Sequence, residues 1–453
     1  VKRVEDKSDL SLPALVLTHT NAGVAAIRNR LRRREVPSSH FRVDTIARFA
    51  LQWARSFPET TGYSPFDEQP DFSAAYDCAT TAFQIAPIRR VLSRSYDELL
   101  VDEYQDCTTA QHDFVLVIAD TLPCRIYGDP LQGVFAFGDG ELIDWREDIL
   151  PKFEINTEER PWRWDAEGND ELGEHLRQIR RKLIDGGSID LENGPNAFQW
   201  KKQPSNPSNR VRENCRLAYR LMRRDGPVFL LRKWRNQVRD TASKLGGNYQ
   251  CIEPLTDDSL RTHAESLGDT TGLERAVALF DAVDDCATKV GSTLRGMRDR
   301  LAEGKRSQAR KYSAQADALH AFADAEQLDW DLARIAIDTL LDLDDAIVYR
   351  RELLDELRTA IREYAAGEDE NLVEAAERIR RVKRFTGRRL PHHCAARPIM
   401  VKGLECDHVL LIGASDFGRK ELYVAMTRAK ESVTIISSDP KLKFEPSSLS
   451  SVL

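Results

Sequence analysis

The sequence predicts an α/β fold in which parallel sheets alternate with helices and carry helical insertions. Short apolar runs, such as residues 99–101, end in acidic or glycine-containing turns, which is typical of buried parallel strands. Amphipathic segments with helical spacing separate these runs over residues 1–40 and 91–150. The same alternation begins again near residue 151, which indicates a second α/β unit.

Interruptions of this alternation give the expected domain limits. A first α/β domain spans residues 1–150, with a small insertion at about 41–90 that is mostly helical in pattern and contains three prolines. Residues 256–395 have apolar side chains at three- and four-residue spacing and few Gly or Pro, so we expect a helical insertion there. The second α/β domain then consists of residues 151–255 and 396–453.

Composition restricts the class of protein and of function. The net charge of −7 over 453 residues excludes a basic coat for nucleic acid, although a local stripe of Lys and Arg remains compatible with DNA binding. The eight cysteines are scattered without a C-x-x-C pair, which argues for reduced thiols and against zinc or disulfides. No stretch approaches the roughly 20 apolar residues that cross a bilayer. We therefore expect a cytoplasmic protein with no membrane partner.

Residues 97–106, DELLVDEYQD, carry the strongest chemical signal. The apolar strand is followed at once by Asp102 and Glu103, with Asp106 three positions further on. P-loop NTPases hold Mg²⁺ through a carboxylate at the carboxyl end of a buried strand, and a second carboxylate can orient the attacking water. The alternative, an acidic exit from strand to loop, is disfavoured by the motifs on either side.

The next signal is a Gly-Asp turn followed by Gln132, within the sequence YGDPLQGVFAF at residues 127–137. A glutamine in this position could sense a γ-phosphate. Asp-Glu-x-Gln-Asp followed by Gly-Asp-x-x-Gln-x-x-x-x-Phe resembles motifs II and III of superfamily 1 helicases, above all the UvrD/PcrA/Rep-type group.

The resemblance covers most of the chain in the order of the family. It implies two RecA-like parallel-sheet domains with helical insertions, the 1A/1B/2A/2B-type arrangement. The remaining similar segments are ALVLTHTNAG at 14–23 (motif Ia), DTIARF at 44–49 (Ib), ERPWRW at 159–164 (IV), VFLLR at 228–232 with Asn236-Gln237 behind it, VKGLECDHV at 401–409 (V) and LYVAMTRAK at 422–430 (VI).

Five residues receive catalytic roles from the resemblance. Asp102 would hold Mg²⁺, and Glu103 would activate or orient the attacking water. Gln132 would contact the γ-phosphate of ATP and couple it to the DNA site. Arg163 and Arg428 would reach the γ-phosphate from the second domain, so hydrolysis would require closure of the cleft.

Three further residues would bind the nucleotide. Trp162 lies where the family often has a Tyr stacked on adenine, although it could instead be a core tryptophan. Glu405 would contact the ribose or connect to the phosphate site, with a surface carboxylate as the alternative. Gly403 belongs to the same motif V stretch.

Single-stranded DNA would bind through stacked aromatic residues and contacts to its phosphates. The resemblance places Phe135 and Phe137 at base-stacking positions and His19 at an aromatic position, whereas core packing is the alternative for each ring. The other residues expected to contact the DNA backbone are Thr20, Asn21 and Arg48.

The chain departs from the family in three places. It contains no G-x-x-x-x-G-K-[ST] phosphate-binding loop; we expect this loop to precede residue 1, and the alternative is a natural protein that lacks it. Gly138-Asp139 replaces the Arg-Gly of motif III, and residues 397–399 replace the Thr-x-His of motif V. Both changes lie on the DNA-facing side or on the coupling between the two sites, so they weaken the expectation of unwinding more than that of ATP hydrolysis.

Two functions follow from the resemblance. The first is an ATP- and Mg²⁺-dependent motor on single-stranded DNA, or on DNA with a single-stranded tail, moving 3′→5′. The second is a nucleotide- or DNA-sensing regulatory subunit with a protein partner such as a nuclease, for example in antiviral defence. The pathway, DNA repair or defence, stays open. The basic stripe at residues 378–389 could bind DNA, dock a partner or be the solvated face of a helix.

Overall fold

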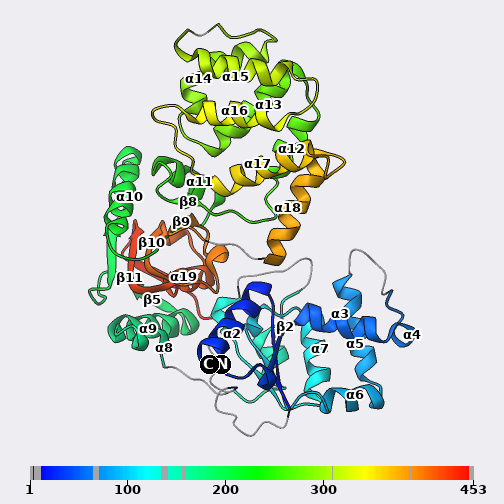
Figure 1. Ribbon diagram of the computed structural model, residues 1–453. Coiled ribbons are helices and arrows are strands. Elements are labelled where there is room, and N and C mark those ends of the chain that lie inside the picture. The colour runs from blue at the N-terminus through cyan, green and yellow to red at the C-terminus, as the bar shows by residue number, and fades with distance from the viewer. Residues whose placement is uncertain are drawn as a thin grey trace.

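The computed structural model has an α/β fold with two parallel sheets and a predominantly helical unit (Figure 1). None of the helices in the described part of the chain is long and apolar enough to cross a membrane. The structure describes residues 4, 12–64, 71–133, 141–155, 160–308, 310–386 and 390–447.

The first sheet has four parallel strands in the order β2-β1-β3-β4. Every residue of β1 and β3 is buried, as expected for interior strands covered on both faces. The strands are β1 (Ala14–Thr18), β2 (Phe41–Thr45), β3 (Glu98–Val101) and β4 (Cys124–Ile126), and the helices around them are α2 (Asn21–Arg33), α3 (Ile46–Ser56), α4 (Pro58–Thr61), α5 (Phe72–Phe83), α6 (Ala86–Ser93) and α7 (Thr109–Ala119).

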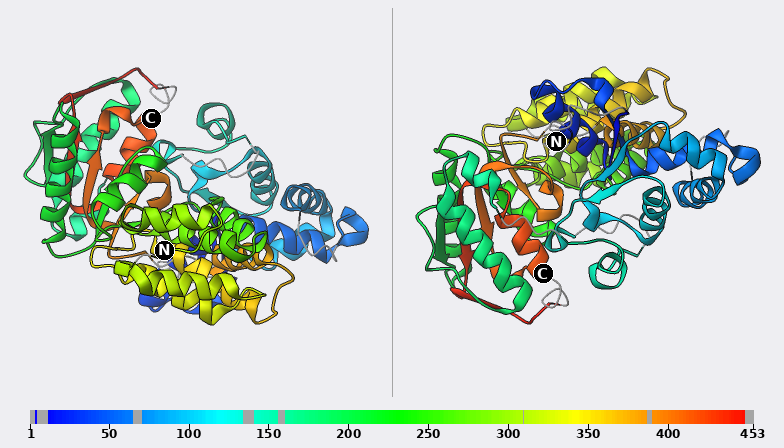
Figure 2. Two further views of the ribbon diagram at one scale, coloured as in Figure 1. Left: turned by 90° about the horizontal axis from the view of Figure 1, so that it is seen from above. Right: turned by 90° about the horizontal axis from the view of Figure 1, so that it is seen from below.

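Within the range expected for a small helical insertion, residues 41–45 form strand β2, and α3 to α6 follow. These blue helices lie at the end of the first unit that is far from the red and green second sheet (Figure 2). They are held by aromatic packing: Phe83 stacks on Phe114 at 5.8 Å between ring centroids, and Trp53 lies 4.8 Å from Phe83. The insertion therefore shares a core with α7 of the first sheet.

The second sheet has six strands in the order β6-β11-β10-β7-β9-β8, all paired in parallel. Its central strands β7 and β10 are apolar and almost entirely buried, which is why they occupy the middle. The strands are β6 (Phe198–Lys202), β7 (Val228–Leu231), β8 (Gln250–Cys251), β9 (His393–Ala396), β10 (Cys406–Ile412) and β11 (Ala429–Ser437), with an antiparallel pair β5 (Gly187–Asp190) and β12 (Lys441–Phe444) beside them. The helices of this unit are α8 (Trp162–Ala166), α9 (Asp170–Asp185), α10 (Pro207–Met222), α11 (Arg235–Lys244) and α19 (Arg419–Met426).

The helical unit is inserted between β8 and β9 and has a hydrophobic core of its own. Phe280, Leu319, Phe322, Ile337 and Leu357 are all buried in this core. The helices are α12 (Ser259–Gly268), α13 (Gly272–Cys286), α14 (Val290–Ala302), α15 (Ser313–Asp324), α16 (Trp330–Leu341), α17 (Arg351–Ala365) and α18 (Leu372–Thr386).

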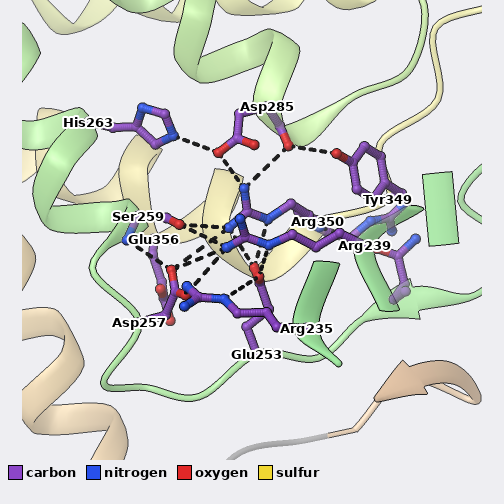
Figure 3. Close-up of polar contacts among 12 residues, drawn as sticks. Arg235, Arg239, Glu253, Asp257, Ser259, His263, Asp285, Tyr349, Arg350 and Glu356 are labelled. Atoms are coloured by element: carbon purple, nitrogen blue, oxygen red, sulfur yellow. Dashed lines mark hydrogen bonds and ion pairs between the residues drawn. The ribbon is translucent and has the colours of Figure 1, made fainter. Parts of the chain in front are cut away.

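An ionic cluster joins the helical unit to the second sheet (Figure 3). At its centre is Arg350, which is only 1% exposed. Its Nη2 lies 2.6 Å from Glu253, in the connection after β8, and its Nη1 pairs with Asp285 on α13. Burial alone would raise the pKa of Asp285, but His263 and Arg350 outweigh this and lower it to about 2. The junction is therefore fixed by charges that satisfy one another.

Three cations of the basic stripe at residues 378–389 are paired with carboxylates. Arg378 lies 2.7 Å from Asp369, Arg380 lies 3.2 Å from Glu356, and the ammonium of Lys383 lies 2.7 Å from the same glutamate. These three charges are therefore neutralised by neighbouring carboxylates rather than displayed for DNA or a partner.

Candidate functional site

The exit of β3 positions two carboxylates at the carboxyl edge of the first sheet. The amide of Asp102 still donates to the carbonyl of Leu17 at 2.9 Å, which continues the sheet by one residue. Glu103 then adopts φ 56° and ψ 40°, a left-handed conformation that is uncommon for a residue with a side chain. Gln105 donates from Nε2 to the carboxylate of Glu103. The residue predicted to act on water is therefore one of the described non-glycine residues with a left-handed backbone.

Asp102 has the electrostatics of a cation ligand. Burial, and then the charge of Glu103, raises the pKa of Asp102. A divalent cation would favour the ionised carboxylate and offset this cost. Within the described residues, no group of three or more His, Cys, Asp or Glu side chains could hold a metal. One carboxylate fits Mg²⁺ that is held mainly by substrate phosphates and water, rather than by an all-protein cage.

A hydrogen bond between Gln132 and Arg428 links the two α/β units. Gln132 follows β4, and its Oε1 accepts a 3.1 Å hydrogen bond from Arg428 Nη2, while its Nε2 donates to Asp129 at 3.2 Å. Arg428, after α19, is 2% exposed, and its Nε donates to the carbonyl of Val424 at 3.0 Å. Burial, and then the charge of Arg163, lowers the pKa of Arg428 to about 10. The guanidinium is therefore still charged at neutral pH.

Arg163 and Glu405 complete this side of the cleft. Arg163, on α8, lies 2.9 Å from Glu405 and donates to the carbonyl of Thr427, next to Arg428. Glu103 is close enough to Arg428 to influence its ionisation. Two arginines of the second unit and the Glu103 carboxylate of the first therefore lie near one another. Their catalytic roles stay a prediction.

A buried ion pair, not predicted as a site feature, connects the sheets beside this cluster. Lys402 Nζ lies 2.5 Å and 2.6 Å from the two carboxylate oxygens of Asp106, and both side chains are almost fully buried. Burial raises the pKa of Asp106 to about 6 despite the opposing charge of Lys402. In the sequence, Asp106 ends one motif and Lys402 lies within another, but nothing there indicated that the two residues pair.

Asp129 is a second feature that sequence reasoning missed. It accepts from Arg180 Nη2 at 3.3 Å, and its amide donates to the Gln105 side chain at 2.9 Å. The neighbouring Gly128 is closely packed, because a Cβ there would lie 2.7 Å from Gln105 Oε1 and 3.1 Å from Trp145, and these side chains would have to shift. The turn before Gln132 is thus fixed from both sheets.

The predicted nucleotide-binding residues lie at the rim of the cluster. Trp162 is 48% exposed, and the guanidinium of Arg160 lies over its ring at 3.9 Å from the centroid. The ring is thus already in contact with a cation rather than packed in a core. Gly403 has φ +75°, and a Cβ at this position would have no atom within 4 Å. Glycine is therefore favoured here by the left-handed backbone and not by a lack of space.

Three of the residues predicted to bind DNA form one group at the start of α2. The hydroxyl of Thr20 accepts from the amide of Gly23 at 3.0 Å and caps the helix, while Asn21 Oδ1 accepts from Arg48 Nη2 at 3.1 Å. His19 is partly buried beneath them, with Nε2 3.6 Å from the sulfur of Cys107. Phe135 and Phe137 lie outside the described residues.

His19 should make stability depend on pH. Burial, and then the charge of Lys402, lowers its pKa from 6.5 to about 4. Between these values the unfolded chain binds a proton that the folded chain does not, so acidification favours unfolding. From about pH 7 to about pH 5, this residue should remove about 2 kcal/mol of stability. The free energy of unfolding in urea should therefore fall by about 2 kcal/mol less for His19→Gln than for the wild type between pH 7 and pH 5. An equal fall in both proteins would contradict the lowered pKa of His19.

The comparison with known protein families gives a match in the part of the chain that contains β3 and β4 of the first sheet. Residues 68–143 match the family model of the UvrD/REP helicase N-terminal domain. The matched segment contains Asp102, Glu103, Asp129 and Gln132, whereas Arg163 and Arg428 lie beyond it. No curated protein matches the chain.

Proposed function

We propose that this chain, which is related to the UvrD-type helicases, is an ATP-driven motor on single-stranded DNA that moves 3′→5′. ATP would be hydrolysed in the cleft between two RecA-like domains built on the two sheets. The observation that carries the proposal is the hydrogen bond from Arg428 to Gln132, because it joins a cation of the second unit to the turn after β4, the strand that pairs with β3.

Each residue of the cluster has a task in phosphoryl transfer to water. Asp102 would hold Mg²⁺, which when bound neutralises charge on the phosphates. Glu103 orients the attacking water, and its left-handed backbone directs the carboxylate toward Gln105 and the second sheet. Arg163 and Arg428 stabilise negative charge that develops as the γ-phosphoryl is transferred. Hydrolysis also requires a phosphate-binding loop, which the printed sequence does not contain.

Coupling to DNA would run through the turn that holds Gln132. Gln132 contacts Arg428, and the same turn is tied to α9 through Asp129 and Arg180. Loss of the γ-phosphate would remove an anion shared by both sheets and so permit the cleft to open. Alternating closure and opening moves two DNA-binding surfaces relative to each other, which is what a motor along a strand requires.

The test is ATP hydrolysis by the intact natural protein with and without single-stranded DNA. DNA should stimulate turnover, and Glu103→Gln should reduce it at least about 100-fold, since a positioned general base contributes roughly 10²–10⁴. Asp113→Asn, an exposed carboxylate on α7, is the matched control and should retain activity. Displacement of a bound block from one end only of a single strand tests the 3′→5′ direction.

Two outcomes would contradict the proposal. If the intact protein shows no turnover under any of these conditions, it is not an autonomous motor, and a subunit activated by a partner such as a nuclease becomes the better account. If Glu103→Gln hydrolyses ATP as fast as the wild type, then the β3 exit is not the catalytic site.

A further inference from the structure

The outer side of α10 is a surface that the proposed mechanism does not use. This helix lies on the side of the second unit that is far from the first unit (Figures 1 and 2). Its inner side packs against β7 and β10, where Leu217, Ala218 and Leu221 are buried. The opposite side faces solvent, so the side chains there are available to another molecule.

Four arginines form a row on this outer side. The row, which we call the arginine row, consists of Arg212, Arg216, Arg220 and Arg223, and all four are exposed. Their spacing of four, four and three residues places them on one face of the helix. Within the described residues, Arg216 pairs with Glu213 at 2.5 Å, and no ion pair involves the other three.

Helix stability does not account for the arginine row. Like charges at three- and four-residue spacing repel one another and destabilise a helix. The helix dipole favours a cation in the last turn, where Arg220 lies, but it does not favour Arg212 in the second turn. Carboxylates of the fold neutralise Arg378 and Arg380 on α18, whereas most of the arginine row lacks such partners. The row is therefore matched to an anion from outside the chain.

An apolar seam runs beside the arginine row. It consists of Cys215, Tyr219 and Met222, which follow one another at i, i+4 and i+7 between the row and the buried side. Tyr219 is 37% exposed, and its hydroxyl donates to the carbonyl of Leu245 at 3.2 Å, which fixes the ring. Apolar residues at this spacing form the stripe through which one helix packs on another.

The row and the seam together select the kind of partner. A second helix with apolar residues at the same spacing would pack on the apolar seam. Carboxylates flanking its apolar stripe would then meet the arginine row, and a guanidinium binds a carboxylate through two parallel hydrogen bonds. An acidic amphipathic helix therefore satisfies both features with one contact.

A nucleic acid would satisfy the charges alone. Single strands are held by several aromatic rings in succession, but Tyr219 is the one aromatic residue in the sequence of α10. Cys215 and Met222 offer a phosphate chain no favourable contact, and the carboxylate of Glu213 beside Arg216 repels it. The composition of the surface thus favours a protein segment.

We propose that the outer side of α10 is a docking surface for an acidic amphipathic helix of a partner protein. The arginine row supplies charge and the apolar seam supplies the packed contact. Because the whole surface belongs to one helix of the second unit, a bound partner would stay in place when the cleft opens and closes. The proposal goes beyond the proposed function and does not depend on it.

The test uses the intact protein and a fluorescent synthetic peptide of about three heptads, with Leu at positions a and d and Glu at e and g. Fluorescence anisotropy should show saturable binding. Arg212→Glu combined with Arg220→Glu should weaken binding at least about 10-fold, and Tyr219→Ala at least about 5-fold. Arg295→Glu, at an exposed arginine of α14, is the matched control and should stay within about twofold. Circular dichroism and thermal unfolding check that the variants fold.

Four outcomes would overturn the docking surface. The first two are a wild type that does not bind the peptide and charge-reversed variants that bind it as the wild type does. The third is a DNA duplex that displaces the peptide and itself loses affinity in the double variant, which would make the surface a nucleic-acid contact. The fourth is a wild type that sediments as a dimer while the double variant is a monomer, which would give the surface to a second copy.

The DNA-stimulated ATPase separates this proposal from the proposed function. It should be unchanged in the double variant, because α10 lies outside the cleft between the sheets. Loss of turnover in a folded double variant would place the arginine row in the motor cycle and overturn a docking role. Absence of turnover in the wild type would overturn the motor and leave peptide binding as an independent result.

Discussion

Replacing Arg428 by lysine should reduce the turnover number of the DNA-stimulated ATPase by about 10³–10⁵, the effect of removing an arginine finger. Lysine keeps the charge but not the forked donors that let Arg428 reach Val424 and Gln132 together, and that would leave a donor for a phosphoryl oxygen in the proposed reaction. The KM for ATP should change much less, because this contact strengthens in the transition state. Steady-state kinetics measure both quantities.

Because Arg428 is almost fully buried, its replacement could also disturb the fold, and a second variant separates the two effects. Arg163→Lys lies on the short helix α8 and is partly exposed, so it should fold normally and still lower the turnover number by a large factor. Lys430→Met is the control: this partly exposed cation lies close by in sequence and pairs with Glu167 at 3.1 Å and Asp407 at 3.2 Å. An ATPase unchanged in both arginine variants would remove the second sheet from the chemistry.

Breaking the buried pair between Asp106 and Lys402 should have the largest effect on stability. Asp106→Asn leaves the Lys402 ammonium buried without a counter-charge, which typically costs about 3–5 kcal/mol. Since the two residues belong to different sheets, the lost stability should appear as earlier separation and unfolding of both units. Urea denaturation followed by tryptophan fluorescence measures the shift.

The matched double variant tests whether the two residues act as a pair. Asp106→Asn combined with Lys402→Met removes both charges, so it should cost clearly less than the sum of the single variants. The exposed pair of Lys305 with Glu303, 2.9 Å apart, provides the comparison, and Lys305→Met should shift stability by less than about 0.5 kcal/mol. If the stability losses of the two single variants instead add up in the double variant, the two substitutions destabilise the protein for unrelated reasons.

The acidic turn could be located from the sequence because its signal is local. Asp102 and Glu103 lie at the edge of the sheet if the apolar run before them is a buried strand, and β3 (Glu98–Val101) is one. The relationship to UvrD-type helicases was predicted from the same residues and is confirmed over residues 68–143. The α/β class with parallel sheets is confirmed as well.

Contacts between distant segments could not be read in this way. The sequence grouped Arg378, Arg380 and Lys383 as a basic stripe, but the fold sets carboxylates such as Asp369 and Glu356 beside them. Residues 41–45 read as part of a helical insertion, although β2 pairs with β1 and belongs to the first sheet. In both cases the deciding neighbour comes from another element of the chain.

The sequence by itself determined which residues are expected to carry chemistry, because residue type and the order of motifs are properties of the chain. Tertiary structure alone decided which distant residues meet, such as Gln132 with Arg428 and Asp106 with Lys402. The physical reason is that charge pairing and burial depend on distance in space. Residues almost 300 positions apart, such as Gln132 and Arg428, become neighbours only when two sheets pack together.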